Sequence, residues 1–194
     1  MEQLRKAIGT YGIGIGTDTV KVDMFLNHRI DTGLLFAMGK AWAEEFRETR
    51  PELVLTVEAS GIAMAVAAAH ELGDIPVVFA KKNAAVTNTG DLLRADVYSF
   101  THKQMNTICV DRKYLPEGSR VLIIDDFLAD GEAVKGMMNL CEQRKASVVG
   151  VGIAVEKGFQ PGGRELREAG IRLKSLAIVD RIEDGKIVLR PESD

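Results

Sequence analysis

Short apolar runs alternate along the chain with longer stretches of helical periodicity, a pattern typical of an α/β fold with a mainly parallel sheet. Residues 121–124 (Val-Leu-Ile-Ile) are apolar at every position, which indicates a strand covered on both faces and therefore central in the sheet. Similar runs predict further strands at 53–57, 75–80, 96–100, 106–110, 148–155, 173–179 and 187–189, with 96–100 and 106–110 as candidates for an antiparallel edge pair.

Helical patterns fill most of the intervals between these runs. Asp31 is a candidate N-cap for a helix that continues to about residue 47 and contains Trp42, which we interpret as a core or dimer-contact residue. Residues 61–70 are rich in alanine, and their small side chains would let a helix lie close to the sheet. Residues 131–144 place apolar side chains on one helical face, and shorter helices are predicted at 2–8 and 164–169.

Three segments lack a clear period. Residues 9–16 contain alternating glycines but follow no predicted strand, so we interpret them as a flexible connector rather than a dinucleotide-binding loop. Residues 20–26 predict a short extended piece. Residues 83–94 are polar and long for a passive connector, so we expect a mobile functional loop that closes over a site.

Composition and charge narrow the function classes. The 194 residues suit one domain, and the apolar fraction of 46% and charged fraction of 27% are ordinary for a globular protein. Lys and Arg number 25 against 28 Asp and Glu, a net charge of −3. This lack of a basic excess argues against a dedicated nucleic-acid binder or a protein that binds anionic membranes.

Cysteine and histidine positions predict no metal site. Cys109 and Cys141 match no metal or redox spacing, and we expect two buried free thiols in a reducing compartment. The three histidines show no ligand spacing. The first residues have no apolar segment of the signal-peptide kind, and no apolar run approaches the length of about 18 residues that spans a membrane. We therefore expect a cytoplasmic protein with no membrane or nucleic-acid partner.

Residues 121–133 carry the strongest chemical signal. The apolar run leads into Asp125 and Asp126, and a short loop containing Gly131 then opens a helix. The unpaired N–H groups and the dipole at a helix start favour an anion such as phosphate, and two adjacent carboxylates can accept hydrogen bonds from vicinal hydroxyls. The combination fits a sugar phosphate. On geometry alone, a buried strand that ends in solvated or helix-capping aspartates explains it equally well.

Other polar groups also follow predicted strands. Residues 58–61 come after the strand at 53–57, Lys81 and Lys82 come after 75–80, and Lys157 comes after 148–155. Because the carboxyl ends of parallel strands meet at one edge of a sheet, where open α/β sheets bind ligands, we expect these groups to converge. Taken singly, each has a plainer reading as a strand-to-helix turn or as solvated lysines.

The segment 121–133 resembles the motif by which type I phosphoribosyltransferases bind 5-phosphoribosyl 1-pyrophosphate (PRPP). The apolar residues, the two acids and Gly131 match in order. The chain departs from the family at Asp130, Glu132 and Ala133, where glycine and threonine are common. Backbone amides would then hold the phosphate, with the side chains of Asp130 and Glu132 turned away from it.

Residues 21–28, 96–100 and 156–162 are similar to bacterial phosphoribosyltransferases that act on xanthine, and the resemblance covers essentially the whole chain. It implies the type I phosphoribosyltransferase fold, an α/β fold with a mainly parallel central sheet flanked by helices. It further implies a single domain over 1–194 with a small hood from about 1–35 and 157–194. The implied activity is transfer of the 5-phosphoribosyl group from PRPP to xanthine by a homodimer, with Mg²⁺ held mainly by PRPP rather than by direct protein ligands.

The resemblance also implies roles for single residues. Asp125 and Asp126 would bind the ribose hydroxyls, and Val20, Asn27 and Lys157 match purine-contacting positions. Lys157 would donate to the 6-oxo oxygen, Asn27 would read the substituent at the 2-position, and Phe159 is a candidate for stacking on the purine. The 5′-phosphate would meet Ala129, Asp130, Gly131, Glu132 and Ala133. Pyrophosphate would meet Ala59, Ser60, Gly61, Lys81 and Lys82, in a loop where some family members have a non-proline cis peptide.

Three alternatives stay open. The same class of enzyme could prefer guanine or hypoxanthine, since a few hood contacts decide the base. A non-catalytic, PRPP-sensing transcriptional regulator can share the domain, although such proteins usually add a basic DNA-binding module for which this chain has neither length nor charge. The third alternative is a structural α/β domain in which the motif is coincidental.

Overall fold

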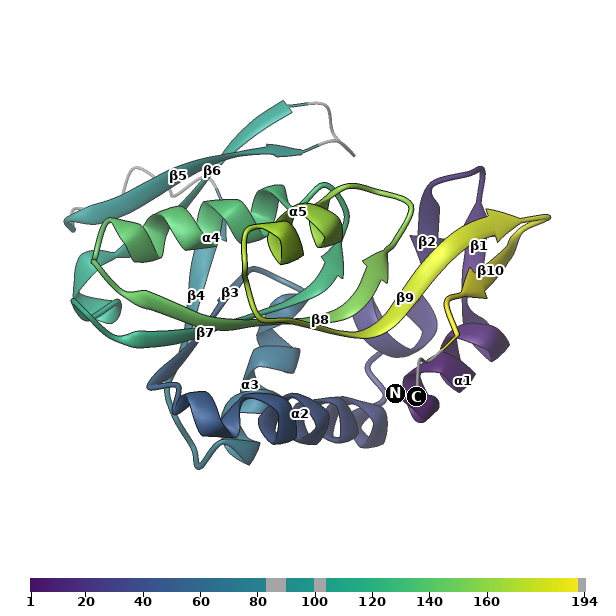
Figure 1. The fold of residues 1–194 in the computed structure, drawn as a ribbon, viewed down its shortest axis with the longest axis horizontal. Coiled ribbons are helices and arrows are strands. Elements are labelled where there is room, and N and C mark those ends of the chain that lie inside the picture. The colour runs from purple at the N-terminus through teal and green to yellow at the C-terminus, as the bar shows by residue number, and fades with distance from the viewer. Residues whose placement is uncertain (83–89, 100–103, 192–194) are drawn as a thin grey trace.

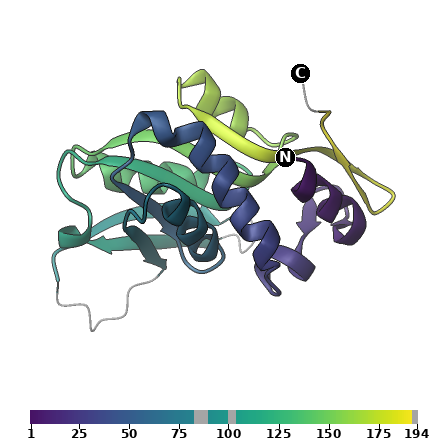
Figure 2. The ribbon, with the colours of Figure 1, turned by 90° about the horizontal axis from the view of Figure 1, so that it is seen from below.

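The computed structural model describes residues 1–82, 90–99 and 104–191. Eight strands form one sheet in the order β10-β9-β8-β7-β3-β4-β6-β5. Helices α2 and α3 cover one face of this sheet, and α4 and α5 cover the other (Figure 1). Seen from below, α2 runs across the sheet, whereas α1 lies at one end beside the N-terminal strands (Figure 2). This three-layer arrangement confirms the predicted α/β class.

The middle of the sheet is parallel. Parallel pairings join β4 to β3, β3 to β7, β7 to β8 and β8 to β9, so the carboxyl ends of five strands face the same edge. These strands are β3 (Leu53–Val57), β4 (Val77–Lys82), β7 (Arg120–Leu128), β8 (Ser147–Lys157) and β9 (Leu173–Glu183). The strand at 53–57 has the predicted bounds.

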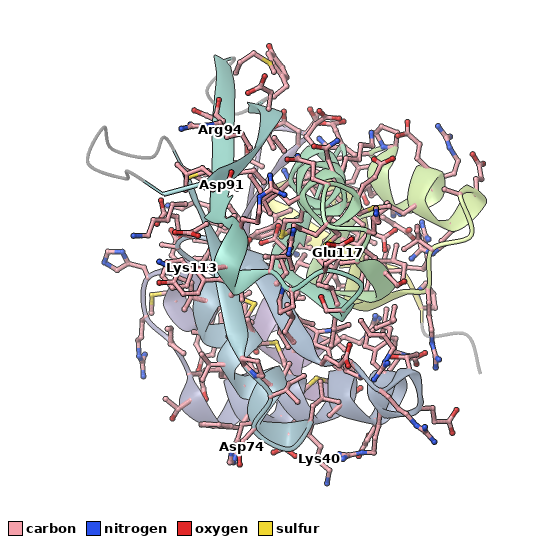
Figure 3. The ribbon with its side chains drawn as sticks, turned by 90° about the vertical axis from the view of Figure 1, so that its left-hand side faces the viewer. Lys40, Asp74, Asp91, Arg94, Lys113 and Glu117 are labelled. Atoms are coloured by element: carbon pink, nitrogen blue, oxygen red, sulfur yellow. The ribbon has the colours of Figure 1, made fainter. Side chains whose placement is uncertain are left out.

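Antiparallel strands close both ends of the sheet. The predicted edge pair is confirmed as β5 (Leu92–Ser99) and β6 (Gln104–Asp111), and β10 (Lys186–Leu189) pairs with β9. Asp91 and Arg94 lie at the β5 edge of the sheet (Figure 3). Just outside the two strands, Arg112 Nε lies 2.6 Å from Asp91 Oδ2. Charge on an edge strand discourages pairing with other chains.

Several predicted boundaries were wrong near the candidate site, since β4 includes Lys81 and Lys82 and β8 includes Lys157. Strand β7 continues past Ile124 to Leu128, because Asp125 and Phe127 keep main-chain pairing with Ile153 and Val155 of β8. Sheet pairing uses backbone groups, so a change from apolar to acidic side chains does not end a strand. The polar segment expected at 83–94 is also shorter: residues 92–94 belong to β5, and residues 83–89 lie outside the described residues, as does residue 100 of the predicted edge strand.

Five α-helices stand in the predicted positions, with ends shifted by a few residues. The Asp31 side chain accepts a hydrogen bond from the Leu34 amide at 3.0 Å, which confirms it as the N-cap of α2. The helices are α1 (Glu2–Tyr11), α2 (Thr32–Phe46), α3 (Gly61–Glu71), α4 (Glu132–Glu142) and α5 (Gly162–Glu168).

The N-terminal segment differs most from the prediction. The glycine-rich stretch is no flexible connector, because β1 (Ile13–Ile15) pairs with β2 (Thr19–Lys21) as a hairpin. A π-helical turn, Asp23–Asn27, replaces most of the predicted extended piece. The Gly14 amide donates to the Gly185 carbonyl at 3.0 Å, and a side chain on Gly14 would collide with Ile182 of β9. Glycine therefore lets this hairpin lie against the C-terminal hairpin.

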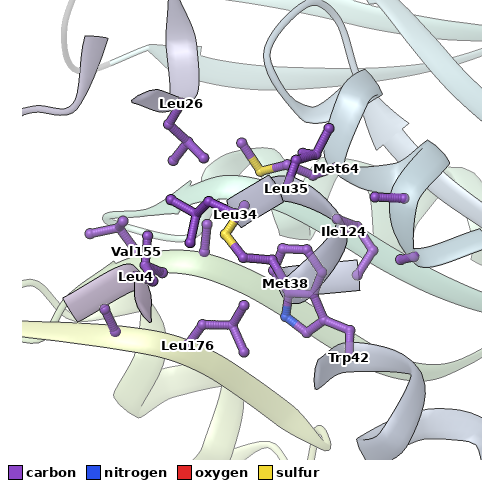
Figure 4. Close-up of a cluster of buried hydrophobic side chains, with 14 of the residues drawn as sticks. Leu4, Leu26, Leu34, Leu35, Met38, Trp42, Met64, Ile124, Val155 and Leu176 are labelled. Atoms are coloured by element: carbon purple, nitrogen blue, oxygen red, sulfur yellow. The ribbon is translucent and has the colours of Figure 1, made fainter. Parts of the chain in front are cut away.

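Two apolar clusters fill the space on either side of the sheet. The cluster under α2 and α3 contains Trp42, which is fully buried and therefore a core residue (Figure 4). Gly39 of α2 permits this packing, since a Cβ there would lie 2.6 Å from the Ala67 backbone of α3. The second cluster lies under α4 and includes Cys141. Cys109 and Cys141 are buried and free, as predicted.

Candidate functional site

The polar groups in the last residues of β4, β7 and β8, and those just after β3, all lie at the carboxyl edge of the parallel strands. In Figure 1 the ends of β7 and β8 point toward the N-terminal hairpin. The ends of β3 and β4 are joined directly: the Glu58 amide donates to the Ala80 carbonyl at 3.0 Å, and the Lys82 amide donates to Glu58 Oε1 at 2.7 Å. The convergence predicted from parallel pairing is therefore present.

Asp125 and Asp126 have different surroundings. Asp125 is 4% exposed, and its Oδ1 accepts a hydrogen bond from the Asp126 amide at 3.0 Å. Burial, followed by the negative charge of Asp126, raises the pKa of Asp125 well above its ordinary value. Asp126 is half-buried, so it is the more accessible of the two carboxylates.

The loop at residues 129–133 leads from β7 into α4. Gly131 is the N-cap of α4 with φ of 84°, a left-handed conformation that glycine adopts without steric cost. The Gly162 amide donates to the Ala129 carbonyl at 3.0 Å, and a Cβ on Gly162 would lie 2.6 Å from the Gly131 nitrogen. The loop therefore packs against the backbone at the start of α5, and the first N–H groups of α4 have no partner within the helix.

Lys135 fastens this loop from the first turns of α4. Its Nζ donates to the Asp130 carbonyl at 3.3 Å, to Glu132 Oε1 at 3.3 Å and to Glu165 Oε2 of α5 at 2.8 Å. The Glu132 carboxylate thus has a cation beside it, which lowers the repulsion an incoming phosphate would meet. No local pattern indicates the role of Lys135, because its partner Glu165 lies 30 residues further along the chain.

The β3–α3 connection lies beside the two aspartates. The peptide bond between Glu58 and Ala59 is cis. Gly61 opens α3, and a Cβ on Gly61 would collide with the Thr56 hydroxyl and lie 3.3 Å from Asp125 Oδ1. Only a residue without a side chain allows the N-terminus of α3 to come this close to Asp125.

Lys81 and Lys82 do not act as a pair. Neighbouring residues on a strand point to opposite faces, and the charge of Lys82 acts on Asp125, whereas Lys81 lines a separate hollow with Phe79 and Tyr114. Lys82 is therefore the lysine that lies near the acidic pair.

Hood residues reach the same edge. Asn27 Nδ2 donates to Asp126 Oδ2 at 3.0 Å, and Lys157 Nζ donates to the Asp18 carbonyl in the β1–β2 turn at 2.8 Å. Burial lowers the pKa of Lys157, against the opposing charges of Asp18 and Asp130. Val20 is 7% exposed and packs within the core cluster, and Phe159 is partly exposed in the loop after β8.

The model of the phosphoribosyl transferase domain family matches residues 29–172. Sequence relatives extend the match over the full chain. The xanthine phosphoribosyltransferase of Oceanobacillus iheyensis is 46% identical, covering 100% of this chain and 99% of the relative. The chain belongs to the phosphoribosyltransferase family.

Other comparisons agree with this membership. The xanthine phosphoribosyltransferase of Stutzerimonas stutzeri is 48% identical, covering 96% of this chain and 98% of the relative. Among solved structures, the adenine phosphoribosyltransferase of Rhodothermus marinus has a TM-score of 0.73 at 23% identity, over 92% of this chain and 97% of that chain. The enzyme of Giardia lamblia with 9-deazaadenine has a TM-score of 0.73 at 20% identity, over 90% and 96%. At these identities the structures show the shared fold.

Candidate metal ligands are scattered in the described part of the chain. No three side chains of His, Cys, Asp or Glu gather there in a way that could hold a metal ion. Of the described helices, none has the length and apolar character needed to cross a membrane.

Proposed function

We propose that the chain transfers the 5-phosphoribosyl group from PRPP to xanthine, giving xanthosine 5′-monophosphate and pyrophosphate. Family membership supports the use of PRPP, and the full-length relatives named for xanthine support the choice of base. The structural observation that carries the proposal is the 3.0 Å hydrogen bond between Asn27 and Asp126. It brings the residue expected to read the purine next to the carboxylate expected to bind the ribose.

The sugar phosphate binds across the end of β7. Backbone amides of residues 129–133 and the start of α4 hold the 5′-phosphate, because that helix end presents unpaired N–H groups and a positive dipole. Asp126 accepts hydrogen bonds from the ribose hydroxyls. Asp125 is 4% exposed, so only a small part of its carboxylate can meet the ribose hydroxyls. It also accepts a hydrogen bond from the Asp126 amide and so helps to orient Asp126.

Pyrophosphate occupies the neighbouring loop. The backbone N–H groups of Ala59, Ser60 and Gly61 at the start of α3 face the leaving group, and Lys82 adds positive charge close to the acidic pair. Lys81 lines a hollow on the other side of the strand, so its part in pyrophosphate binding requires a change of rotamer.

The purine lies under the hood. Lys157 donates to the 6-oxo oxygen and rejects a 6-amino group, since two donors facing each other in a buried site leave both unpaired. Asn27 reads the oxygen at the 2-position of xanthine, and Val20 with Phe159 supplies apolar surface at the ring. Lys157 Nζ donates to the Asp18 carbonyl, so the 6-oxo oxygen of xanthine would take the place of one acceptor of this ammonium.

The reaction needs no protein nucleophile. The bond from C1′ to the pyrophosphate oxygen breaks while a ring nitrogen of the purine bonds to C1′, and that nitrogen loses its proton. Positive charge develops on the ribose ring, so the protein acts by positioning the two substrates and stabilising charge. Mg²⁺ bound with PRPP would supply positive charge against the pyrophosphate, and its preference for phosphate oxygens and waters would let PRPP hold most of its ligand positions.

Two wider expectations accompany this proposal. The N-terminal segment to about residue 35 and the segment 157–194 form the hood, supported by the Gly14–Gly185 hydrogen bond between the two hairpins. The enzyme works as a homodimer, as the family resemblance implies, and in the cytoplasm, where the two free thiols suit a reducing compartment.

The test is product formation from PRPP and Mg²⁺ with xanthine, guanine, hypoxanthine, adenine and orotate in parallel. Xanthosine 5′-monophosphate should form fastest and adenine should be the poorest purine. A faster reaction with guanine or hypoxanthine than with xanthine would show that the enzyme prefers that purine instead. A faster reaction with adenine than with xanthine would contradict the role of Lys157. A lack of turnover with every base would refute the proposed enzymatic activity.

A further inference from the structure

An ion pair between the buried Glu156 and the more exposed Arg167 joins β8 to α5 directly behind the site. Arg167 of α5 donates from Nη1 to Glu156 Oε1 and from Nη2 to Glu156 Oε2, both at 2.7 Å, and the Ser175 hydroxyl of β9 donates to the same carboxylate. Glu156 is 2% exposed. Burial by itself would raise the pKa of Glu156, but the bonds from Arg167 and Ser175 hold that pKa below its ordinary value, so the carboxylate stays charged.

Glu156 lies next to both the expected purine-binding residue Lys157 and the strand that leads into the loop at 129–133. It precedes Lys157 in β8, and its register partner in β7 is Leu128, the residue before the loop at 129–133. No step of the proposed reaction uses Glu156, and it contacts neither reacting group.

Two consecutive glycines connect the carboxylate to the phosphate-binding loop. A side chain on Gly163 would collide with the Glu156 carboxylate, so the start of α5 lies directly against it. Gly162, one residue earlier, donates its amide to the Ala129 carbonyl at 3.0 Å. A continuous line of contacts therefore runs from Glu156 through Arg167 and the start of α5 to the backbone of residue 129.

We propose that Glu156 is a positioning residue, which sets the shape of the loop at 129–133 by holding α5 through Arg167. The inference rests on the proposed function, since that loop is where PRPP places its 5′-phosphate. A bidentate guanidinium–carboxylate pair fixes both the distance and the angle between its elements, which a single hydrogen bond does not. The loop amides keep their spacing only while α5 stays in this orientation.

The first test compares Glu156→Gln with the wild type in steady-state kinetics at a temperature where both are folded. The KM for PRPP should rise about 10- to 100-fold, the range expected when binding groups move by a fraction of an ångström to an ångström. The value of kcat at saturating PRPP should change less. Glu45→Gln is the matched control, because Glu45 also pairs with an arginine, Arg172 at 2.9 Å, between α2 and the start of β9. Its KM for PRPP should equal that of the wild type.

A second variant separates positioning from stability. Breaking one partner of a buried pair costs stability, whereas replacing both partners by apolar side chains often restores it. In Glu156→Met/Arg167→Met the midpoint of thermal unfolding should recover toward that of the wild type, while the KM for PRPP stays raised. Titration with xanthosine 5′-monophosphate gives the same comparison without turnover, and affinity should fall by a similar factor.

The outcomes discriminate between two failures. A KM for PRPP that recovers together with stability in the double variant, or that is unchanged in Glu156→Gln, overturns the positioning role. A wild type that neither turns over PRPP nor binds the nucleotide instead refutes the proposed function.

Discussion

Asn27 Nδ2 donates a hydrogen bond to Asp126 Oδ2 at 3.0 Å, joining the hood to the end of β7 across 99 positions in the chain. The residue expected at the purine thus contacts the residue expected at the ribose. We expect substrate to displace both partners: ribose hydroxyls would replace Asn27 at Asp126, and the released Asn27 amide would then hydrogen-bond to the base.

This relationship predicts a split effect of Asn27→Ala. The KM for xanthine should rise about tenfold, which is the effect expected from the loss of one hydrogen bond, because the oxygen at the 2-position loses its partner. The KM for PRPP should stay the same or fall, since Asp126 no longer has a competing donor. Asn139→Ala, an exposed asparagine on α4, is the control and should change neither constant. Equal increases in both KM values would contradict the account.

Lys157 should govern the choice between 6-oxo and 6-amino purines. Lys157→Met keeps much of the side-chain length but removes the donor, and the ratio of kcat/KM for xanthine to that for adenine should fall about 5- to 150-fold. Initial rates with both bases measure this ratio. Lys186→Met alters an exposed lysine of β10 and should leave it unchanged. An unaltered ratio in Lys157→Met would remove this residue from base selection.

Gly162→Ala should damage PRPP binding more than folding. The added Cβ would lie 2.5 Å from the Ala129 carbonyl oxygen and 2.6 Å from the Gly131 nitrogen, so the loop must move. We expect kcat/KM for PRPP to fall on the order of 100-fold. Gly9→Ala is the matched control, because nothing lies within 4 Å of a Cβ there and alanine favours a helix by about 1 kcal/mol. Full activity in Gly162→Ala would show that the loop is not shaped by this contact.

Asp125 makes stability depend on pH in a defined direction. Its pKa is raised in the folded state, so the unfolded chain ionises first as pH rises, and the free energy of unfolding falls between the ordinary aspartate range and the raised value. Asp125→Asn keeps the acceptor for the Asp126 amide and removes this cost. The unfolding midpoint of the variant should therefore exceed that of the wild type by a margin that grows as the pH rises above the ordinary aspartate range. Parallel pH profiles would contradict the burial of a titrating group here.

Local patterns predicted the parts of the fold that depend on neighbouring residues. The apolar run at 121–124 identified the central strand, and Asp31 identified the start of α2, because an N-cap acts within one helical turn. Parallel pairing then placed Lys82, Lys157 and Asp126 at one edge, as expected.

Features that depend on distant residues escaped the sequence analysis. Strand β1 has three residues and is held by β2 and by Gly185, neither of which its own sequence indicates. The contacts of Lys135 with Glu165 and of Glu156 with Arg167 join separate elements, and in sequence each is an ordinary charged residue. The unequal burial of Asp125 and Asp126 depends on α3, which packs Gly61 against the first of them.

The most direct test of the central claim is a crystal structure of the protein with xanthosine 5′-monophosphate. The phosphate oxygens should lie about 2.7–3.2 Å from backbone nitrogens of residues 129–133, with a ribose hydroxyl at the same distance from Asp126 and the Asn27 amide turned to the base. A nucleotide phosphate bound away from the start of α4, with Asn27 still hydrogen-bonded to Asp126, would contradict the account.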